Sequence, residues 1–373
     1  MNSLPAGYAL LEYRIEKVLG VGGFGLTYLA LDSNLNLKVA LKEFLPGDIA
    51  LRAPDQSIGP RSPDTAESFG WGKRRFMDES RTVASFRHPN IVRVMRFFEA
   101  NGTAYMVMEF VEGAALGEWV KTRRPLSEAQ VAPIVAPLLD GLEVIHRAGF
   151  LHRDIKPGNI YIREDGSPVL LDFGSARQKA TELTAVVSPG YAPFEQYHTH
   201  GKQGPWSDIY AFGGVLYWMV AGSMPQEAPA RVREDNMAAA VQVGDKSRFR
   251  PEFLAAIDWA LSPFEDQRPQ NVAEWRAALL ETKSAQQPTA ETAPTSKPAT
   301  TPRPRLPADV LKRAEQRLAQ HIGPVAGVVV KRAAARARDE AELYLMLADE
   351  IEDKDERKAF VRQAVSISGR PTN

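Results

Sequence analysis

The chain has 373 residues, its 46 lysines and arginines balance 46 aspartates and glutamates, and it contains no cysteine. A chain of this length is expected to fold as about two or three domains. The balanced charge creates no global field that would attract nucleic acid, so we expect no nucleic-acid partner. The absence of cysteine excludes disulfides, thiolate nucleophiles and cysteine-bound zinc.

Two features bear on the location of the protein. The most apolar run, residues 210–222, is too short to span a bilayer and is typical of a buried core helix. The first residues lack the basic start and the apolar block of a signal peptide. We therefore expect a cytoplasmic protein with no membrane span.

The first third of the chain is predicted to be rich in strands that flank a glycine cluster. The candidate strands are residues 14–20, 26–32, 37–44, 91–98 and 104–111. A helix is predicted over residues 73–86, because Phe76, Val83 and Phe86 recur at helical spacing. Residues 43–75 resemble an insertion, and the sequence leaves open whether it is ordered or flexible.

From about residue 114 the apolar pattern becomes mostly helical, which completes a first domain over residues 1–282. Residues 283–308 are rich in proline, threonine and alanine and lack apolar periodicity, so we expect a disordered linker. Apolar residues then return at helical spacing, and residues 309–368 are predicted to form a bundle of about four helices. Pro324 suits a helix start there, and Asp339 with Glu342 has the spacing of a capping box.

A glycine-rich turn and a downstream lysine form the first candidate site. The turn has the spacing G-x-G-x-x-G and consists of Gly20, Val21, Gly22, Gly23, Phe24 and Gly25. Alone it is a weak signal, because glycines in strand turns usually serve the backbone. Lys42 follows in the next strand, and Glu79 lies on the predicted helix. The two form either a surface ion pair or a grip on phosphates.

Residues 150–162, FLHRDIKPGNIYI, concentrate polar side chains between apolar strands. Asp154 can accept the proton of a hydroxyl nucleophile, and Lys156 can neutralise a transferred phosphoryl group. Asn159 and Asp172 offer oxygen ligands for a hard cation, and the strands between them can pair as a hairpin that makes them neighbours. A surface turn would explain this loop alone, but it does not explain the whole series of motifs in one order.

Taken together, the motifs resemble the eukaryotic-like, bacterial-type Ser/Thr protein kinases over about residues 13–280. They are LGVGGFG, VALK, Glu79, RHPNIV, YMVMEF, LHRDIKPGN, LDFG, SPGYAPFE, SDIYAFG and DQRP. The resemblance implies an α+β bilobal kinase fold with a β-rich N-lobe, a helical C-lobe and ATP in the cleft. It implies transfer of the γ-phosphate of ATP to serine or threonine of protein substrates, with autophosphorylation, in bacterial-type signalling.

The same resemblance assigns roles to individual residues. Asp154 would be the catalytic base, Lys156 would contact the γ-phosphate, and Lys42 would pair with Glu79 and grip the α- and β-phosphates. Asn159 and Asp172 would bind Mg²⁺ or Mn²⁺. The residues implied to surround ATP, besides Lys42 and the glycine turn, are Ala40, Met108 as gatekeeper and the hinge residues Glu109 and Val111. The residues implied to organise the site are Val83, Val94, His152, Phe173, Gly174, Glu195, Asp208 and Arg268.

Two positions depart from the family pattern. Thr27 stands where the family usually has a small apolar residue above adenine, and Phe194 replaces the proline of the Ala-Pro-Glu motif. Glu195 is retained, so its ion pair with Arg268 is still expected, and the departure concerns the geometry of the substrate loop.

The same resemblance suggests a hypothesis for how the protein is regulated. Arg153 can receive a phosphate on the segment after Asp172, where Thr181 and Thr184 are the candidate sites. Ser188 lies nearer the substrate-facing turn, where a hydroxyl often serves structure. His198 and His200 lack a third ligand in the sequence, which favours a polar loop over a metal site.

Two other functions remain as alternatives. A pseudokinase would lack Lys42, Asp154, Asn159 or Asp172, and all of these are present. A small-molecule kinase is disfavoured by the long activation segment with its Gly-Tyr pair and Glu195. Residues 309–368 are expected to bind a protein partner, to dock on the first domain or to self-associate.

Overall fold

The computed structural model describes residues 3–172, 177–178, 187–198, 201–281, 306–322, 326–337 and 339–348, with residues 357 and 360. The chain divides into two compact units, of which the first comprises residues 1–231 and 235–282 and the second includes residues 283–373. Among the predicted site residues, Phe173, Gly174, Thr181 and Thr184 lie outside the described residues, as does most of the predicted linker.

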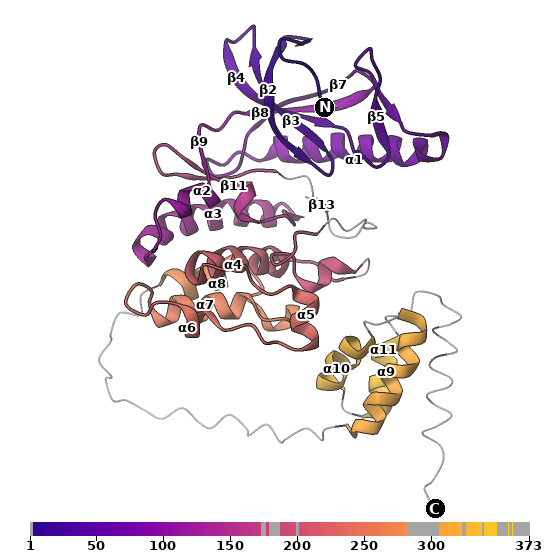
Figure 1. Ribbon diagram of the computed structural model, residues 1–373. Coiled ribbons are helices and arrows are strands. Elements are labelled where there is room, and N and C mark those ends of the chain that lie inside the picture. The colour runs from indigo at the N-terminus through magenta and orange to yellow at the C-terminus, as the bar shows by residue number, and fades with distance from the viewer. Residues whose placement is uncertain are drawn as a thin grey trace, which may run out of the picture. The chain divides into compact units, whose positions relative to one another are not determined.

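The first unit has a small lobe built on an antiparallel sheet of six strands in the order β1-β2-β3-β4-β8-β7 (Figure 1). The strands are β1 (Ala9–Leu10), β2 (Tyr13–Gly22), β3 (Gly25–Asp32), β4 (Leu37–Phe44), β7 (Val94–Ala100) and β8 (Thr103–Glu109). These confirm the predicted strands, except that β7 starts later than expected. Ile91 and Val92 instead contact Leu170 of the large lobe. The backbone N–H of Val92 donates to the carbonyl oxygen of Leu170 at 3.0 Å.

The insertion between β4 and the helix is ordered. It contains a hairpin of β5 (Ala50–Arg52) and β6 (Ile58–Pro60) and a 3₁₀ turn η1 (Pro63–Thr65) that leads into α1 (Ala66–Ser85). The prediction that the helix starts near residue 73 was wrong. The helix begins earlier because Phe69 adds to the buried face that also carries Phe76 and Val83, so that the preceding turns can pack as well.

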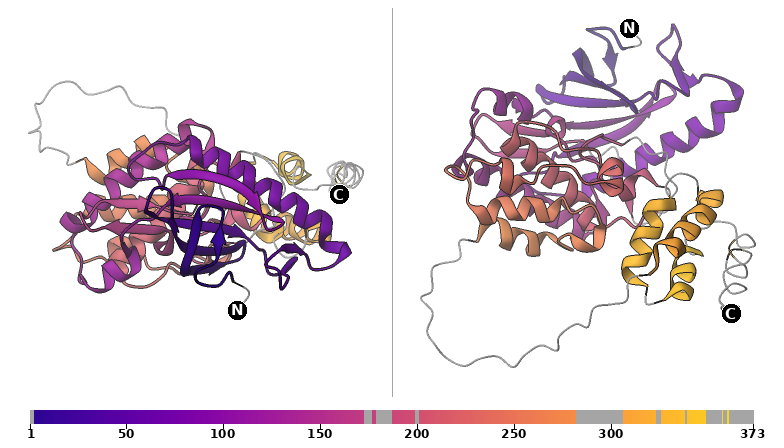
Figure 2. Two further views of the ribbon diagram at one scale, coloured as in Figure 1. Left: turned by 90° about the horizontal axis from the view of Figure 1, so that it is seen from above. Right: turned by 60° about the horizontal axis from the view of Figure 1, so that its bottom comes forward.

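The large lobe is mainly helical, and the sheet of the small lobe lies to one side of its helices in Figure 1 and in the right view of Figure 2, whereas the two overlap when seen from above. Its helices are α2 (Leu116–Lys121), α3 (Glu128–Arg147), α4 (Pro205–Ala221), α5 (Ala228–Arg233), α6 (Ala240–Val243), α7 (Pro251–Ala260) and α8 (Val272–Leu280). Helix α4 is the predicted buried core helix and is apolar almost all round. Phe212 of α4 meets the buried Trp275 edge to face at 5.7 Å.

Short strands at the top of the large lobe carry the candidate site. Strand β11 (Ile160–Arg163) lies between β9 (Gly113–Ala115) and β12 (Pro168–Leu170), and β10 (Phe150–Leu151) pairs with β13 (Arg177–Gln178). Short 3₁₀ turns precede or follow the polar loops, namely η2 (Pro157–Asn159), η3 (Phe194–Tyr197) and η4 (Glu265–Gln267). In the described part of the chain, no helix combines the length with the hydrophobicity that crossing a bilayer requires.

The second unit is helical where it is described. Its helices are α9 (Ala308–Ile322), α10 (Ala326–Arg336) and α11 (Glu340–Ala348), and residues 357 and 360 are also helical. Their apolar faces share a core that includes Leu318, Val330 and Leu347. The predicted cap of the third helix is present, since the Glu342 N–H donates to Asp339 Oδ1 at 2.8 Å. Pro324 and most of the predicted fourth helix lie outside the described residues.

Candidate active site

The glycine turn forms the predicted hairpin between β2 and β3, with Val21 opposite Leu26 and Gly22 opposite Gly25. Gly25 has φ +146°, and a Cβ there would lie 1.9 Å from the carbonyl oxygen of Glu43 in β4. This position therefore requires glycine for structural reasons. A Cβ on Gly20 or Gly23 would meet nothing within 4 Å, so these positions leave open space beside the turn.

Lys42 lies in β4 opposite Thr27 and Met106, and 8% of the residue is exposed. Its ammonium group is ion-paired with the carboxylate of Asp172. Burial alone lowers the pKa of Lys42, but Asp172, Glu79 and Asp154 together raise it above its ordinary value. Lys42 is thus a firmly held cation whose ion-pair partner in this structure is Asp172, and its predicted pair with Glu79 stays a prediction.

Asp154 is surrounded by hydrogen-bond donors. Its Oδ2 accepts from Lys156 Nζ at 2.8 Å and from Asn159 Nδ2 at 2.9 Å, and its Oδ1 accepts from Ser188 Oγ at 2.6 Å. Lys156 Nζ also donates to Ser188 Oγ at 3.0 Å. These contacts hold a carboxylate and an ammonium group side by side in a fixed orientation, as proton and phosphoryl transfer require.

Ser188 is a residue of the candidate site that sequence reasoning undervalued. Its chemistry was assigned to structure, whereas its hydroxyl contacts both Asp154 and Lys156. The signal in the sequence that could have indicated its role is its position at the start of the SPGYAPFE segment. Its contact with Asp154 cannot be read from spacing, because the two residues lie far apart along the chain.

Asn159 and Asp172 are brought together as predicted. Ile160 of β11 pairs with Leu170 of β12, and the Leu171 N–H donates to the Asn159 carbonyl at 2.7 Å. The side-chain nitrogen of Asn159 is used by Asp154, to whose backbone carbonyl it also donates at 2.8 Å. The amide oxygen of Asn159 and the carboxylate of Asp172 therefore form a donor set of the kind that Mg²⁺ prefers.

Asp208 holds the backbone of the catalytic loop from α4. Its carboxylate accepts from the N–H of His152 at 2.9 Å and of Arg153 at 2.8 Å, and it contacts His146 Nε2 at 2.7 Å. Burial alone raises the pKa of Asp208, but His146, His152 and the backbone donor hold it below its ordinary value. Asp208 is therefore a buried anion, and Arg153 beside it adopts a left-handed backbone with φ 68°.

His152 is fully buried, and its Nε2 lies 3.0 Å from the Leu171 carbonyl oxygen. Burial lowers the pKa of His152, and this outweighs the nearby carboxylates of Asp208, Asp154 and Asp172. The imidazole is therefore neutral and links the catalytic loop to the strand before Asp172. Val83 and Val94, the other described members of the predicted apolar spine, are also buried.

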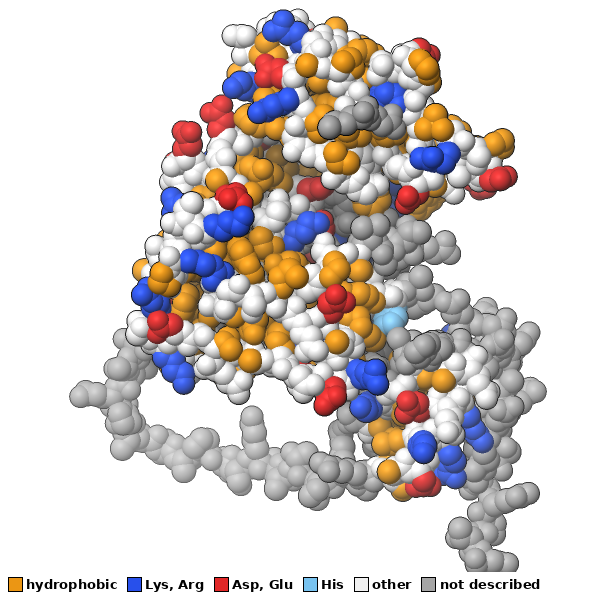
Figure 3. Space-filling view, in the orientation of Figure 1, with side chains coloured by type: hydrophobic (Ala, Val, Ile, Leu, Met, Phe, Trp, Pro, Cys, Tyr) orange, Lys and Arg blue, Asp and Glu red, His pale blue; other side chains and the backbone are white. Residues whose placement is uncertain are grey.

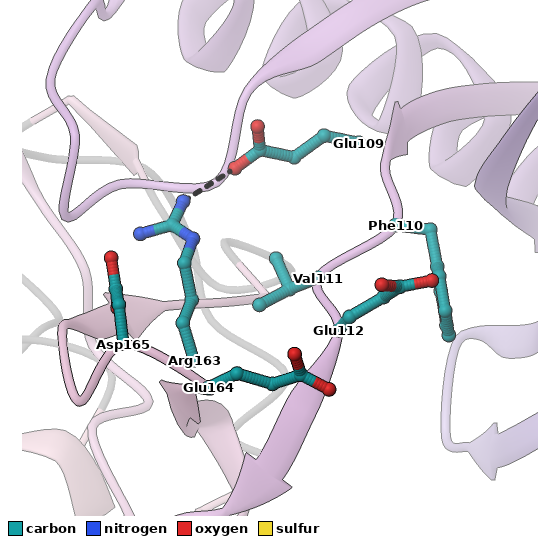
Figure 4. Close-up of a pocket in the computed structure, with 7 residues that line it drawn as sticks. All are labelled: Glu109, Phe110, Val111, Glu112, Arg163, Glu164 and Asp165. Carbon is teal, nitrogen blue, oxygen red and sulfur yellow. Dashed lines mark hydrogen bonds and ion pairs between the residues drawn. The ribbon is translucent and has the colours of Figure 1, made fainter.

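The predicted hinge follows β8. Met108 is buried opposite Ala40 of β4, and Arg163 of β11 donates to Glu109 Oε1 at 3.1 Å. Figure 4 shows this pair in a polar pocket of about 380 Å³. Its lining residues are Glu109, Phe110, Val111, Glu112, Arg163, Glu164 and Asp165. The pocket lies where the hinge meets the β11–β12 hairpin and contains none of the residues around Asp154.

The expected ion pair of Glu195 and Arg268 is present. The Nη1 and Nη2 groups of Arg268 donate to Oε1 and Oε2 of Glu195 at 2.8 Å and 3.2 Å. Ser207 Oγ also donates to Glu195 Oε1, at 2.8 Å. Phe194 is buried and packs edge to face against His198 at 4.4 Å. The replacement of proline by phenylalanine therefore leaves the buried ion pair intact. Residues 199–200, which include His200 of the candidate metal site, lie outside the described residues. Among the described residues, no cluster of His, Cys, Asp or Glu has the arrangement of a metal site.

A hollow between the small and large lobes has basic and acidic side chains on its walls (Figure 3). Strands above it carry the glycine turn and Lys42, and the large lobe below it carries Asp154, Asn159 and Asp172. Fold and geometry together are those of a bilobal protein kinase.

Comparison with known proteins agrees. The family described as "Protein kinase domain" matches residues 13–293, so this chain belongs to the protein kinase family. Members of this family use ATP with a divalent metal and act on protein substrates. Residues 309–372 match a domain of unknown function, DUF8082.

The relatives are bacterial Ser/Thr kinases, which confirms the predicted branch of the family. Serine/threonine-protein kinase PknB of Mycolicibacterium smegmatis is 32% identical over 297 residues, which cover 75% of this chain and 44% of the relative. Serine/threonine-protein kinase PknA of Nostoc sp. is 30% identical, with coverages of 72% and 47%. The chain thus spans less than half the length of these curated relatives. A solved structure titled "PpkA-294 apo form" is 39% identical with a TM-score of 0.66, covering 75% of this chain and 100% of that one.

Proposed function

We propose that this chain is an ATP-dependent protein Ser/Thr kinase that transfers the γ-phosphate of ATP to serine or threonine hydroxyls of proteins. The arrangement around Asp154 supports the proposal most directly. Its carboxylate accepts hydrogen bonds from Lys156, Asn159 and Ser188, and Lys42 of the small lobe is ion-paired with Asp172. The Ser188 contact at 2.6 Å shows that Oδ1 is oriented to accept a hydrogen bond from a hydroxyl.

The residues divide the chemistry among them. Asp154 orients the substrate hydroxyl and accepts its proton, and Lys156 neutralises charge on the transferred phosphoryl group. Lys42 holds the α- and β-phosphates, and its release from Asp172 in favour of Glu79 is part of the proposal. Asn159 and Asp172 would hold Mg²⁺ or Mn²⁺, which supplies further charge neutralisation when bound. Ala40, Met108, Glu109 and Val111 would surround adenine beneath the glycine turn.

The test is transfer of labelled phosphate from γ-labelled ATP by the purified full chain. Asp154→Ala is expected to lower the rate about 100- to 10,000-fold, because a positioned general base contributes that much. Asp140→Ala is the matched control, since its carboxylate is half-exposed and pairs with Arg276 on the surface. Equal rates in wild type and Asp154→Ala would refute the proposed chemistry and favour a binding role.

We further propose autophosphorylation on Thr181 or Thr184, with the phosphate received by Arg153. Mass spectrometry of active protein is expected to find phosphate between residues 175 and 188. Its absence from fully active protein would contradict this. A protein partner or self-association through residues 309–368 and a cytoplasmic location also stay predictions.

A further inference from the structure

The insertion between β4 and α1 is a structured part of the small lobe that the chemistry described above does not use. The β5–β6 hairpin contacts the turn between β7 and β8, where the Ile58 N–H donates to the Asn101 carbonyl at 2.7 Å. The turn η1 then leads directly into α1, and Figure 1 shows the hairpin beside the helix. The insertion therefore connects the strand of Lys42 with the helix of Glu79 through a folded segment.

The first attachment of the insertion is a buried ion pair next to Lys42. Glu43 follows Lys42 in β4, so its side chain points to the opposite face of the sheet. Its carboxylate is ion-paired with Arg52 of β5, and it accepts from Tyr28 at 2.8 Å and from Tyr105 at 2.7 Å. The exposed fractions of the side chains are 0% for Glu43 and 4% for Arg52. Burial and the Glu43 carboxylate raise the pKa of both tyrosines, which keeps them protonated as donors.

The second attachment lies on the other face of β4. Phe44 shares this face with Lys42, and its ring packs against Phe69 at 5.8 Å and Phe76 at 5.7 Å on α1. Gly72 lies between these two on the same side of the helix. A Cβ on Gly72 would approach the tip of the Phe44 ring to 2.7 Å, which is too close without a shift of ring or helix.

The contact stripe continues to the predicted site residue. Residues 69, 72, 76, 79 and 83 follow helical spacing and share one face of α1, so the stripe that meets Phe44 also carries Glu79. Phe44 is two residues from Lys42 on the same strand face. The faces of β4 and α1 that pack together at Phe44 and Gly72 are therefore the same faces that carry Lys42 and Glu79.

We propose that the insertion is a built-in positioning element of the active site. The Glu43–Arg52 pair anchors it on one face of β4, and the close Phe44–Gly72 contact fixes α1 on the other. Arg52, Phe44 and Gly72 act through Lys42 and Glu79 and do not touch the substrate. This role rests on the proposed kinase function.

The first experiment compares Gly72→Ala with Gly70→Ala. Both exchanges raise helix propensity, but a Cβ on Gly70 has ordinary contacts, with its nearest neighbour at 3.6 Å. Gly72→Ala is expected to lower kcat about 10-fold, because small displacements of catalytic groups are costly. Gly70→Ala is expected to retain wild-type kcat. Adding Phe44→Leu to Gly72→Ala is expected to restore part of the loss, because the shorter side chain makes room.

The second experiment measures amide hydrogen exchange in residues 66–85 of the full chain without nucleotide. Arg52→Met is expected to raise exchange in α1, whereas Arg61→Met, in the same insertion but exposed, is expected to leave it unchanged. If Arg52→Met does not fold, the glycine pair still decides the question, because neither glycine exchange removes a buried charge.

The outcomes separate this inference from the proposed function. If the wild type transfers no phosphate, the proposed function fails, and the exchange measurement still tests the attachment of α1. If the wild type is active but Gly72→Ala and Gly70→Ala have equal kcat, or Arg52→Met and Arg61→Met exchange equally, the positioning role is refuted and the kinase function stands.

Discussion

Lys42 and Glu43 are neighbours on one strand, and each forms an ion pair, but their surroundings differ. The Lys42 pair with Asp172 joins a strand of the small lobe to the large lobe, and the exposed fractions of the two side chains are 11% and 44%. The Glu43 pair with Arg52 is buried, and the Glu43 carboxylate accepts further hydrogen bonds from two tyrosines. Because side chains alternate along a strand, one residue step separates a partly exposed ion pair from a fully buried one.

The largest effect on stability is expected from breaking the buried ion pair of Glu43 and Arg52. Glu43→Gln would leave the Arg52 cation buried without its counter-charge, which costs about 3–5 kcal/mol of unfolding free energy. Urea denaturation of the full chain measures it. Glu99→Gln is the matched control, because its partner Lys73 and its own carboxylate are both accessible, and it should cost at most about 1 kcal/mol. Equal losses in the two variants would mean that burial does not distinguish these pairs.

The opposite pattern is expected for the pair of Lys42 and Asp172, in which only the aspartate is substantially exposed. Lys42→Met should lower phosphate transfer about 100-fold or more, because a cation positioned against phosphates is lost. Its unfolding free energy should fall less than that of Glu43→Gln, since the Asp172 side chain left without Lys42 is 44% exposed and can be hydrated. Activity and urea denaturation measured on one preparation test both parts. A variant that is destabilised but retains full activity per folded molecule would overturn the distinction.

A smaller effect concerns pH. Burial lowers the pKa of His152 below its ordinary value, so the folded state favours the neutral ring. The stabilisation is present above the unfolded pKa of about 6.5 and is lost as pH falls below it. The unfolding free energy should therefore decrease between about pH 7.5 and 5.5.

His152→Phe is expected to reduce this dependence. Denaturation curves at the two pH values provide the measurement. An unchanged slope in His152→Phe would show that other groups cause the pH dependence.

Sequence reasoning succeeded where the chemistry is local. Asp154, Lys156 and Asn159 lie within one short loop, and the hairpin that joins Asn159 to Asp172 was readable from two apolar runs. The buried ion pair of Glu195 and Arg268 was expected from the family resemblance and is present. These features depend on spacing or on retained motif residues, both of which are visible in one sequence.

Contacts between distant segments were less accessible. The Ser188 hydroxyl contacts Asp154, which is 34 residues away along the chain, and His146 contacts Asp208, which is 62 residues away. Neither contact has a periodic signal, because each depends on where a loop or helix is placed by the packing of its neighbours. The same holds for Arg52, which reads as an ordinary charged residue of a loop.

The sequence by itself determined the class of the protein and singled out the residues proposed to carry its chemistry, because short motifs encode local geometry. The tertiary structure decided which partner each charge has. It placed Lys42 against Asp172, sealed Glu43 with Arg52, and packed Phe44 into the space that Gly72 leaves on α1. These choices depend on burial and on close contact between segments far apart in the chain, and one-dimensional spacing does not contain either.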